Sequence, residues 1–368
     1  MFIEQIDKET ILKPLQLIIG IVERKQTLPI LSNVLITHFD GKLRFTATDL
    51  EIQITTTIDI DARANQDSSI TVGGKKLLDI LRVLPDHSKI NLEIRENKAQ
   101  IRTNKSRFTL QTLPAQDFPL LSNQLENSRQ IVLPQKDLKA LLFSVQYAMA
   151  QQDVRYYLNG VLLTVADNML KAVATDGHRL AYNAGYINGS FEKQEIILPR
   201  KAVAELSKLL ADTDESVELE FSQQQLKATF SGITLITKVI DGKFPDYERV
   251  IPSYNNQLSI NRIQTQQALQ RAAILSNEKF RGVRFVLTEK NLSIISSNSE
   301  QEEAHEEIET DYHGDALDIG FNVNYLLDGL NNISCETASF SFGDSNSSIL
   351  ITAPDNPDFR YVVMPMRI

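Results

Sequence analysis

The stretch VRYYLNGVLLTVADNMLKAVATDGHRLA, residues 154–181, decides the fold, because the chain contains three versions of it. Two runs dominated by apolar residues flank Asp167-Asn168, which predicts a β-hairpin with its turn at that dipeptide. The second run leads into Ala174-Thr175-Asp176-Gly177. One hairpin indicates little about function, but its repetition indicates the architecture.

The first version along the chain is LPILSNVLITHFDGKLRFTATDLEIQI, residues 28–54, with Asp40-Gly41 at the turn and Thr48-Asp49 near the end, so that 154–181 is the second version. A more divergent third version, GVRFVLTEKNLSIISSNSEQEEA at 282–304, has Lys290-Asn291 at the expected turn. The three versions lie roughly 125 residues apart, which is the size of a domain rather than of a solenoid repeat.

Each hairpin follows one helix-like segment and precedes another. The six segments are 7–23, 74–84, 136–149, 200–210, 262–275 and 322–333. Runs such as 88–113 alternate apolar and polar residues, as half-buried antiparallel strands do. The pattern predicts an α+β fold of three similar domains, each with two helices on antiparallel sheets. We expect these domains at 1–127, 128–255 and 256–368.

The composition limits the classes of protein to consider. Of 368 residues, 42% are hydrophobic, enough for a core in each domain. No apolar run reaches the roughly 18 residues of a membrane span, and MFIEQIDKET lacks the features of a secretory signal. We therefore expect a cytoplasmic protein. The single cysteine, Cys335, excludes an intrachain disulfide and a cysteine-based zinc site, and we expect neither metal nor cofactor.

The distribution of charge leaves two explanations open. A net charge of −9 argues at first sight against a nucleic-acid partner. However, the six helix-like segments together are slightly basic, and the remainder of the chain is strongly acidic. Either long polar side chains simply prefer helices, or helices face a polyanion while the outer surface repels it.

Seven motifs, in order along the full length, resemble the bacterial DNA polymerase III beta subunit family, the sliding clamps. They are TLPILSN (27–33), TATDLE (46–51), QDVRYYLNG (152–160), ATDGHRLA (174–181), DGKFPDY (241–247), AILSNEKFRGVR (273–284) and YVVMPMR (361–367). That family has no catalytic activity; two subunits pair head to tail into a ring whose helices surround duplex DNA. The resemblance implies a processivity factor without sequence preference, forming a homodimer. It also implies the replicative polymerase, the clamp loader and other proteins with clamp-binding motifs as partners.

Asp176 and His178 suggest an alternative, because neighbouring acid and histidine side chains serve in general acid–base catalysis. No nucleophile-elbow, HExxH or Walker pattern accompanies them. The first version has Asp49-Leu50-Glu51 at the same place, without a histidine. A hydrolase or other enzyme using this pair, and a purely structural repeat protein, remain the competing hypotheses.

Basic residues beside aromatic ones suit contact with phosphates and stacking on bases or sugars, although solvated loops and buried aromatics are ordinary explanations. Basic residues at helix starts oppose the helix dipole, which favours anion binding there. The resemblance implies DNA contacts for Lys25, Gln152 and Tyr156. The full set expected to contact DNA is Arg24, Lys25, Lys75, Lys76, Gln152, Tyr156, Tyr157, Arg200 and Lys201.

An acidic run at 300–307 and a basic run at 102–108 lie in different domains. Most such runs are simply solvated, but opposite charges also make a head-to-tail contact natural. We expect Arg102–Leu110 of one chain to pair, as an edge strand, with Glu300–Ile308 of the other. The predicted interface residues are Arg102, Lys105, Arg107, Phe108, Leu110, Ile274, Leu275, Glu300, Glu302, Glu303 and Glu306.

The terminal YVVMPMRI, 361–368, is either a buried last strand or part of a groove, since flexible methionines suit a site that accepts several peptides. The resemblance implies that this tail and the TDGHRL segment form a pocket for a partner peptide with Leu and Phe anchors. Its expected residues are Leu158, Thr175, Gly177, His178, Arg179, Leu180, Pro245, Arg249, Val250, Asn322, Tyr325, Ser348, Val362, Val363, Met364, Pro365, Met366 and Arg367.

Overall fold

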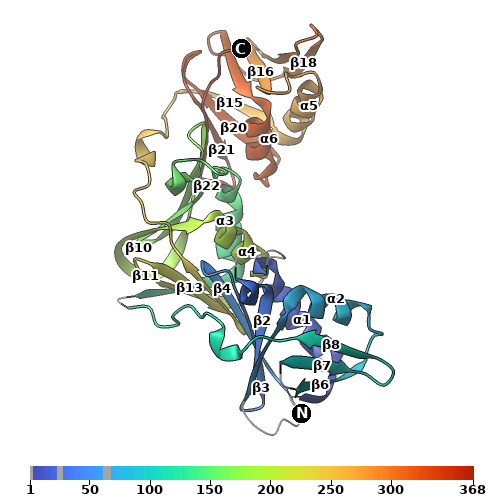
Figure 1. The fold of residues 1–368 in the computed structure, drawn as a ribbon. Coiled ribbons are helices and arrows are strands. Elements are labelled where there is room, and N and C mark those ends of the chain that lie inside the picture. Colours follow the sequence, from blue (N-terminus) through green and yellow to red (C-terminus); the bar gives the residue numbers. More distant parts are fainter. Residues whose placement is uncertain (1–2, 23–27, 61–67, 96, 127) are drawn as a thin grey trace. The chain divides into compact units, whose positions relative to one another are not determined.

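The computed structural model describes residues 3–22, 28–60, 68–95, 97–126 and 128–368. Its contacts divide the chain into two compact units. Figure 1 labels their helices and strands. The first comprises Met1–Lys136 and Ala204–Val239, and the second comprises Asp137–Val203 and Ile240–Ile368. None of the helices in the described residues is long and apolar enough to cross a membrane.

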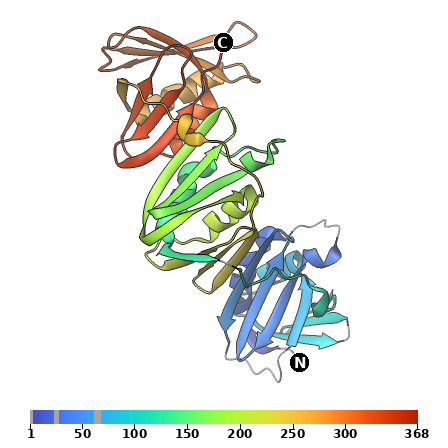
Figure 2. The same cartoon turned by 90° about the vertical axis from the view of Figure 1, so that its left-hand side faces the viewer.

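Two antiparallel sheets form the first unit. One has the strand order β1 (Ile3–Asp7), β6 (Lys89–Arg95), β7 (Lys98–Arg102) and β8 (Arg107–Gln111). The other has the order β5 (Ser68–Gly73), β2 (Asn33–Phe39), β3 (Lys42–Thr48), β4 (Ile52–Asp59), β14 (Ile233–Lys238), β13 (Gln225–Phe230), β12 (Ser216–Phe221) and β9 (Arg129–Pro134). Figure 2 shows the blue strands of this larger sheet side by side. Ile54 pairs with Leu235, so one sheet unites strands from two sequence repeats.

Helices α1 (Lys8–Ile18) and α2 (Gly74–Val83) belong to the first unit. Asp7 caps α1 by accepting a hydrogen bond from the Glu9 backbone N–H. Ile11, Leu15 and Ile18 recur at helical spacing and are buried, so α1 packs one apolar face against the sheet. Helix α4 (Arg200–Leu209) begins in the second unit and ends in the first.

The second unit also contains two antiparallel sheets. One has the order β10 (Gly160–Thr175), β11 (Arg179–Pro199), β22 (Asn356–Val363), β21 (Ile349–Ala353), β20 (Thr337–Phe342) and β15 (Asn256–Asn261). The other has the order β18 (Glu303–Glu309), β17 (Asn291–Ser297), β16 (Gly282–Thr288) and β19 (Leu317–Asn322). Helices α5 (Arg262–Ile274) and α6 (Val323–Asn331) lie in the second unit, and α3 (Gln135–Gln146) begins in the first unit and continues in the second.

Helices occur where the six helix-like segments predicted them, with small differences at the ends. The first is shorter than expected, because α1 ends at Ile18 and a 3-10 turn follows at Ile19–Ile21. The turn at Asp40-Gly41 is present, and both residues have positive φ. In the third version the turn lies one residue earlier than predicted, because Thr288 pairs directly with Asn291.

The predicted turn at Asp167-Asn168 falls inside β10, which is assigned as one strand. The β10–β11 register breaks there, since Asp167 lies opposite Phe191 while Met169 lies opposite Tyr186. Asp167 has φ 52°, close to the 45° of Asp40 in the first version. The dipeptide therefore marks a backbone irregularity, and the β10–β11 connection itself lies at Asp176–His178.

Candidate functional site

The connection between β10 and β11 is held by its own side chains. The Thr175 hydroxyl donates to the carbonyl of Arg179 (2.6 Å) and accepts from the backbone N–H of Gly177 (3.1 Å). Oδ1 of Asp176 accepts from the backbone N–H groups of His178 (2.9 Å) and Arg179 (3.1 Å). The Thr-Asp pair of the motif thus fixes the loop backbone.

The first sequence version builds the same loop. Thr48 donates to the Ile52 carbonyl (2.9 Å), and Oδ1 of Asp49 accepts from the backbone N–H groups of Glu51 and Ile52. Leu50 has φ 77° where Gly177 has φ 91°. The motif therefore encodes the loop, and any difference in function must come from the surrounding residues.

An arginine lies against Gly177. A Cβ at position 177 would meet Nη1 of Arg155 at 3.0 Å, and Arg155 donates from Nη2 to the Asp176 carbonyl (3.2 Å). Asp153 accepts from Nε and Nη2 of Arg155 and from its backbone N–H. These hydrogen bonds from Arg155 lower the pKa of Asp153 to about 2.

Next to this loop lies a cavity of about 250 Å³. Its lining is Arg155, Tyr157, Leu158, Thr175, Gly177, Arg179, Leu180, Pro245, Tyr247, Val250, Val362 and Met364. Leu158, Leu180, Tyr247 and Val362 also belong to one buried apolar cluster, so the walls are anchored in the core. A small apolar cavity with a few polar groups at its rim suits apolar side chains of a ligand.

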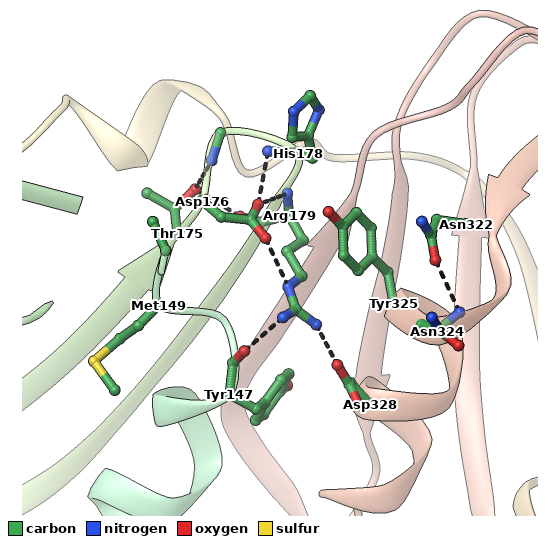
Figure 3. A network of polar contacts seen from close by, with 12 residues as sticks. Tyr147, Met149, Thr175, Asp176, His178, Arg179, Asn322, Asn324, Tyr325 and Asp328 are labelled. Atoms are coloured by element: carbon green, nitrogen blue, oxygen red, sulfur yellow. Dashed lines mark hydrogen bonds and ion pairs between the residues drawn. The ribbon is translucent and has the colours of Figure 1, made fainter. Parts of the chain in front are cut away.

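Arg179 connects the loop to helix α6 and to the segment after α3 (Figure 3). Its Nε donates to Oδ2 of Asp176 (3.1 Å), its Nη1 to Oδ2 of Asp328 in α6 (2.5 Å), and its Nη2 to the carbonyl of Tyr147 after α3 (2.6 Å). The guanidinium also lies over the Tyr325 ring at 4.5 Å. Burial opposes the charge, yet the contacts with Tyr361, Asp328 and Asp176 raise the pKa of Arg179 above its ordinary value.

Nine of the eighteen predicted pocket residues line the cavity, and the others have different surroundings. Asn322 caps α6 by accepting from the Asn324 N–H, while Tyr325 lies under Arg179. Arg249 pairs with Asp246 at 2.8 Å. Ser348 hydrogen-bonds Tyr254. The residues outside the cavity lining are His178, Arg249, Asn322, Tyr325, Ser348, Val363, Pro365, Met366 and Arg367.

Sequence reasoning missed some residues of this site and assigned one elsewhere. Arg155 and Tyr247 line the cavity, although both were quoted only as parts of motifs. Tyr157, expected at DNA, also lines the cavity and packs against the buried cluster. Asp328 carries no motif signal, because its role depends on a contact with a residue 149 positions away.

The enzyme hypothesis requires a contact between the side chains of Asp176 and His178, and the described hydrogen bonds contain none. Both carboxylate oxygens of Asp176 accept hydrogen bonds from His178 and Arg179, but the donor on His178 is its backbone N–H. Asp176 therefore acts as a loop-forming residue. Among the described residues, no group of three or more His, Cys, Asp or Glu side chains could hold a metal.

The residues expected at DNA have mixed surroundings. Lys75 and Lys76 lie in the first turn of α2, and Tyr156 is 57% exposed. Arg200 instead donates from Nη1 to the carbonyls of Met149 (3.2 Å) and Ala150 (3.4 Å). That contact gives Arg200 a structural role that the helix-dipole argument overlooked. Lys201 is the second residue of α4, Gln152 is exposed, and Arg24 and Lys25 lie outside the described residues.

Some residues expected at the dimer interface lie on the edge strands β8 and β18, but Ile274 and Leu275 lie at the end of α5. The acidic strand begins at Glu303 rather than at Glu300. Arg102–Leu110 is not one strand, because β7 ends at Arg102 and the edge strand β8 begins at Arg107. Ile274 is 76% exposed at the end of α5. The acidic edge strand is β18, in which Glu306 already accepts from Arg271 of its own chain (2.6 Å). This hydrogen bond lowers the pKa of Glu306.

Comparison with known proteins decides the family. Models of the N-terminal, central and C-terminal domains of the DNA polymerase III beta subunit match residues 1–122, 132–246 and 248–367. The chain belongs to this family of DNA sliding clamps. It is therefore an α+β protein of three similar domains, as the repeats predicted.

Relatives of this clamp cover nearly its whole length. The beta sliding clamp of Pseudomonas aeruginosa is 46% identical over 99% of both chains, and that of Escherichia coli K12 is 40% identical over 99% of both. A crystal structure of the P. aeruginosa DNA polymerase sliding clamp with ligand matches with a TM-score of 0.96 at 44% identity, covering 100% of each chain. Another P. aeruginosa clamp structure, bound to griselimycin, matches with a TM-score of 0.95 at 45% identity, covering 100% of this chain and 99% of that one.

Proposed function

We propose that two copies of this sliding clamp close a ring around duplex DNA without sequence preference and tether the replicative polymerase through the cavity beside Thr175–Leu180. The observation that favours the tether is the apolar cavity, lined by this loop, Pro245 and the tail residue Met364. Its size suits one or two anchoring side chains such as Leu or Phe, which limits the affinity to a modest value. The clamp loader and other proteins with similar motifs would use the same cavity.

In this proposal the protein performs no chemistry and works in the cytoplasm. Processivity arises because a closed ring cannot leave a DNA circle, even when each contact with phosphate is weak. The domain limits 1–127, 128–255 and 256–368, the basic and aromatic residues assigned to DNA, and the interface residues are parts of the same proposal.

The cavity is tested by placing a charge in it. Met364 is 45% exposed and lines the cavity, so Met364→Glu should weaken binding of a fluorescent peptide with Leu and Phe anchors at least tenfold in anisotropy titrations. Leu120→Glu is the matched control, because Leu120 is also exposed and apolar but lies outside the lining. Equal peptide affinity for wild type and Met364→Glu would place the tether elsewhere.

The ring is tested by its topology. Once loaded, the clamp should remain on circular duplex DNA during gel filtration and should be released when the circle is cut once. Retention that survives linearisation would mean that ordinary contacts, rather than encirclement, hold the protein.

A further inference from the structure

Arg179 borders the cavity, yet its charged group is already occupied by this chain. Each guanidinium nitrogen donates one hydrogen bond, to Asp176, Asp328 or the Tyr147 carbonyl, and only 10% of the side chain is exposed. A partner peptide would therefore meet a fixed surface instead of a free cation. Figure 3 shows that the three acceptors come from the loop, from α6 and from the segment after α3.

We propose that Asp328 is a positioning residue of the peptide pocket, which acts through Arg179 and does not contact the peptide. This inference rests on the proposed peptide-binding function. Asp328 is absent from the lining of the cavity. It holds the guanidinium that joins the Thr175–Leu180 wall to α6, and it keeps that guanidinium over Tyr325.

Asp328 differs from the other two acceptors in what it contributes. Asp176 also fixes the loop backbone, so its loss would disturb the loop directly. Tyr147 contributes a backbone carbonyl, which side-chain substitution leaves in place. Asp328 is 41% exposed and makes the charge-assisted contact from α6, so its carboxylate can be changed without emptying the core. Such contacts are about twice as strong as neutral hydrogen bonds.

Tyr361 fixes the position of α6, the helix that carries Asp328. Tyr361 of β22 donates from its hydroxyl to the Tyr325 carbonyl (2.9 Å). Its ring lies so close to Gly329 that a Cβ there would meet a ring carbon at 2.5 Å. The helix that carries Asp328 is therefore packed firmly, and loss of the carboxylate should release Arg179 and leave the helix in place.

The first test measures peptide affinity in Asp328→Asn, which keeps the size of the side chain and removes its charge. We expect the dissociation constant of the Leu/Phe-anchored peptide to rise about tenfold, because Arg179 loses its charge-assisted contact with α6. Asp318→Asn is the matched control, since Asp318 forms an exposed ion pair with Arg284 in the same unit, outside the cavity. If Asp328→Asn binds the peptide within twofold of the wild-type affinity, the inference about Asp328 is overturned. If the wild-type protein does not bind the peptide at all, the proposed peptide-binding function is refuted instead.

The second test asks whether Asp328 acts through Arg179. In an Arg179→Lys background, and separately in Arg179→Ala in case one variant folds poorly, Asp328→Asn should change the peptide affinity by less than twofold. Asp328→Glu in the wild-type background should recover most of the affinity. A tenfold effect of Asp328→Asn that persists in both arginine variants would show that Asp328 acts by another route and would overturn the proposal.

Discussion

At the scale of single residues, Gly177 occupies a loop position that favours glycine, although the first version has Leu50 there with a φ of 77°. The Gly177 φ of +91° is strained for residues with a Cβ, and Arg155 would lie 3.0 Å from that atom. We expect Gly177→Ala to lower the free energy of unfolding by about 1–3 kcal/mol in chemical denaturation. Gly185→Ala is the control, because it has open space and no positive φ, and it should be neutral or slightly stabilising. Equal losses in both variants would contradict this account.

Asp153 provides a titration prediction at the same scale. Its folded pKa of about 2 lies below the ordinary 3.8, so its ion pair contributes stability above about pH 4, and that contribution disappears as the pH falls toward 2. NMR titration of 13C-labelled aspartates should find this low midpoint, and Arg155→Ala should move it back toward 3.8. The pKa of Asp344, lowered by hydrogen bonds from Ser347 and Asn346, should stay unchanged in that variant.

At the scale of elements, local patterns predicted the helices well, because amphipathic spacing and Asp or Asn caps are encoded within a few residues. Asn261, for example, caps α5 by accepting from the Gln264 backbone N–H. The backbone irregularity at Asp167 was harder to predict, since the residues on either side of it keep different registers with β11. The Thr-Asp motif fixes the loop in two versions, and the 250 Å³ cavity adjoins the loop of the second. Near the loop of the first, Gln53 accepts a hydrogen bond from the Leu121 N–H.

Edge strand β8 yields a prediction about assembly. Arg107 is exposed at the beginning of this edge, and a partner's acidic β18 would be repelled by a negative charge there. Arg107→Glu should shift the protein from dimer to monomer in sedimentation at micromolar concentration. Lys42→Glu, an equal charge reversal on exposed Lys42 in the other sheet, should remain dimeric. Dimerisation of Arg107→Glu equal to wild type would exclude β8 from the interface.

At the scale of the whole molecule, the proposed contacts between basic side chains and phosphates predict a strong salt dependence of DNA binding, even though the net charge of the chain is −9. Weak association with linear duplex should fall steeply between 50 and 200 mM salt, because each phosphate contact releases a counterion. Competition titrations with unrelated duplex sequences should give the same affinity. A preference of tenfold for one sequence would be inconsistent with sliding.

The three-domain architecture was predictable because the same hairpin recurs three times in the sequence. The residues that line the cavity were predictable only in part. The motif identified Thr175, Gly177 and Leu180 as members of one wall. The Arg179–Asp328 contact needed the fold, because no local pattern links α6 to the β10–β11 loop.

The pairing of β4 with β14 has a practical consequence for anyone who divides this chain into pieces. A fragment that stops at residue 122, where the first family match ends, keeps Ile52–Asp59 but loses Ile233–Lys238. Its sheet then ends in a row of unsatisfied backbone groups, which invites self-association during expression or ligand screening. A fragment spanning residues 1–239 retains that pairing, but it removes β22 from β11 and so opens a sheet edge in the second unit instead.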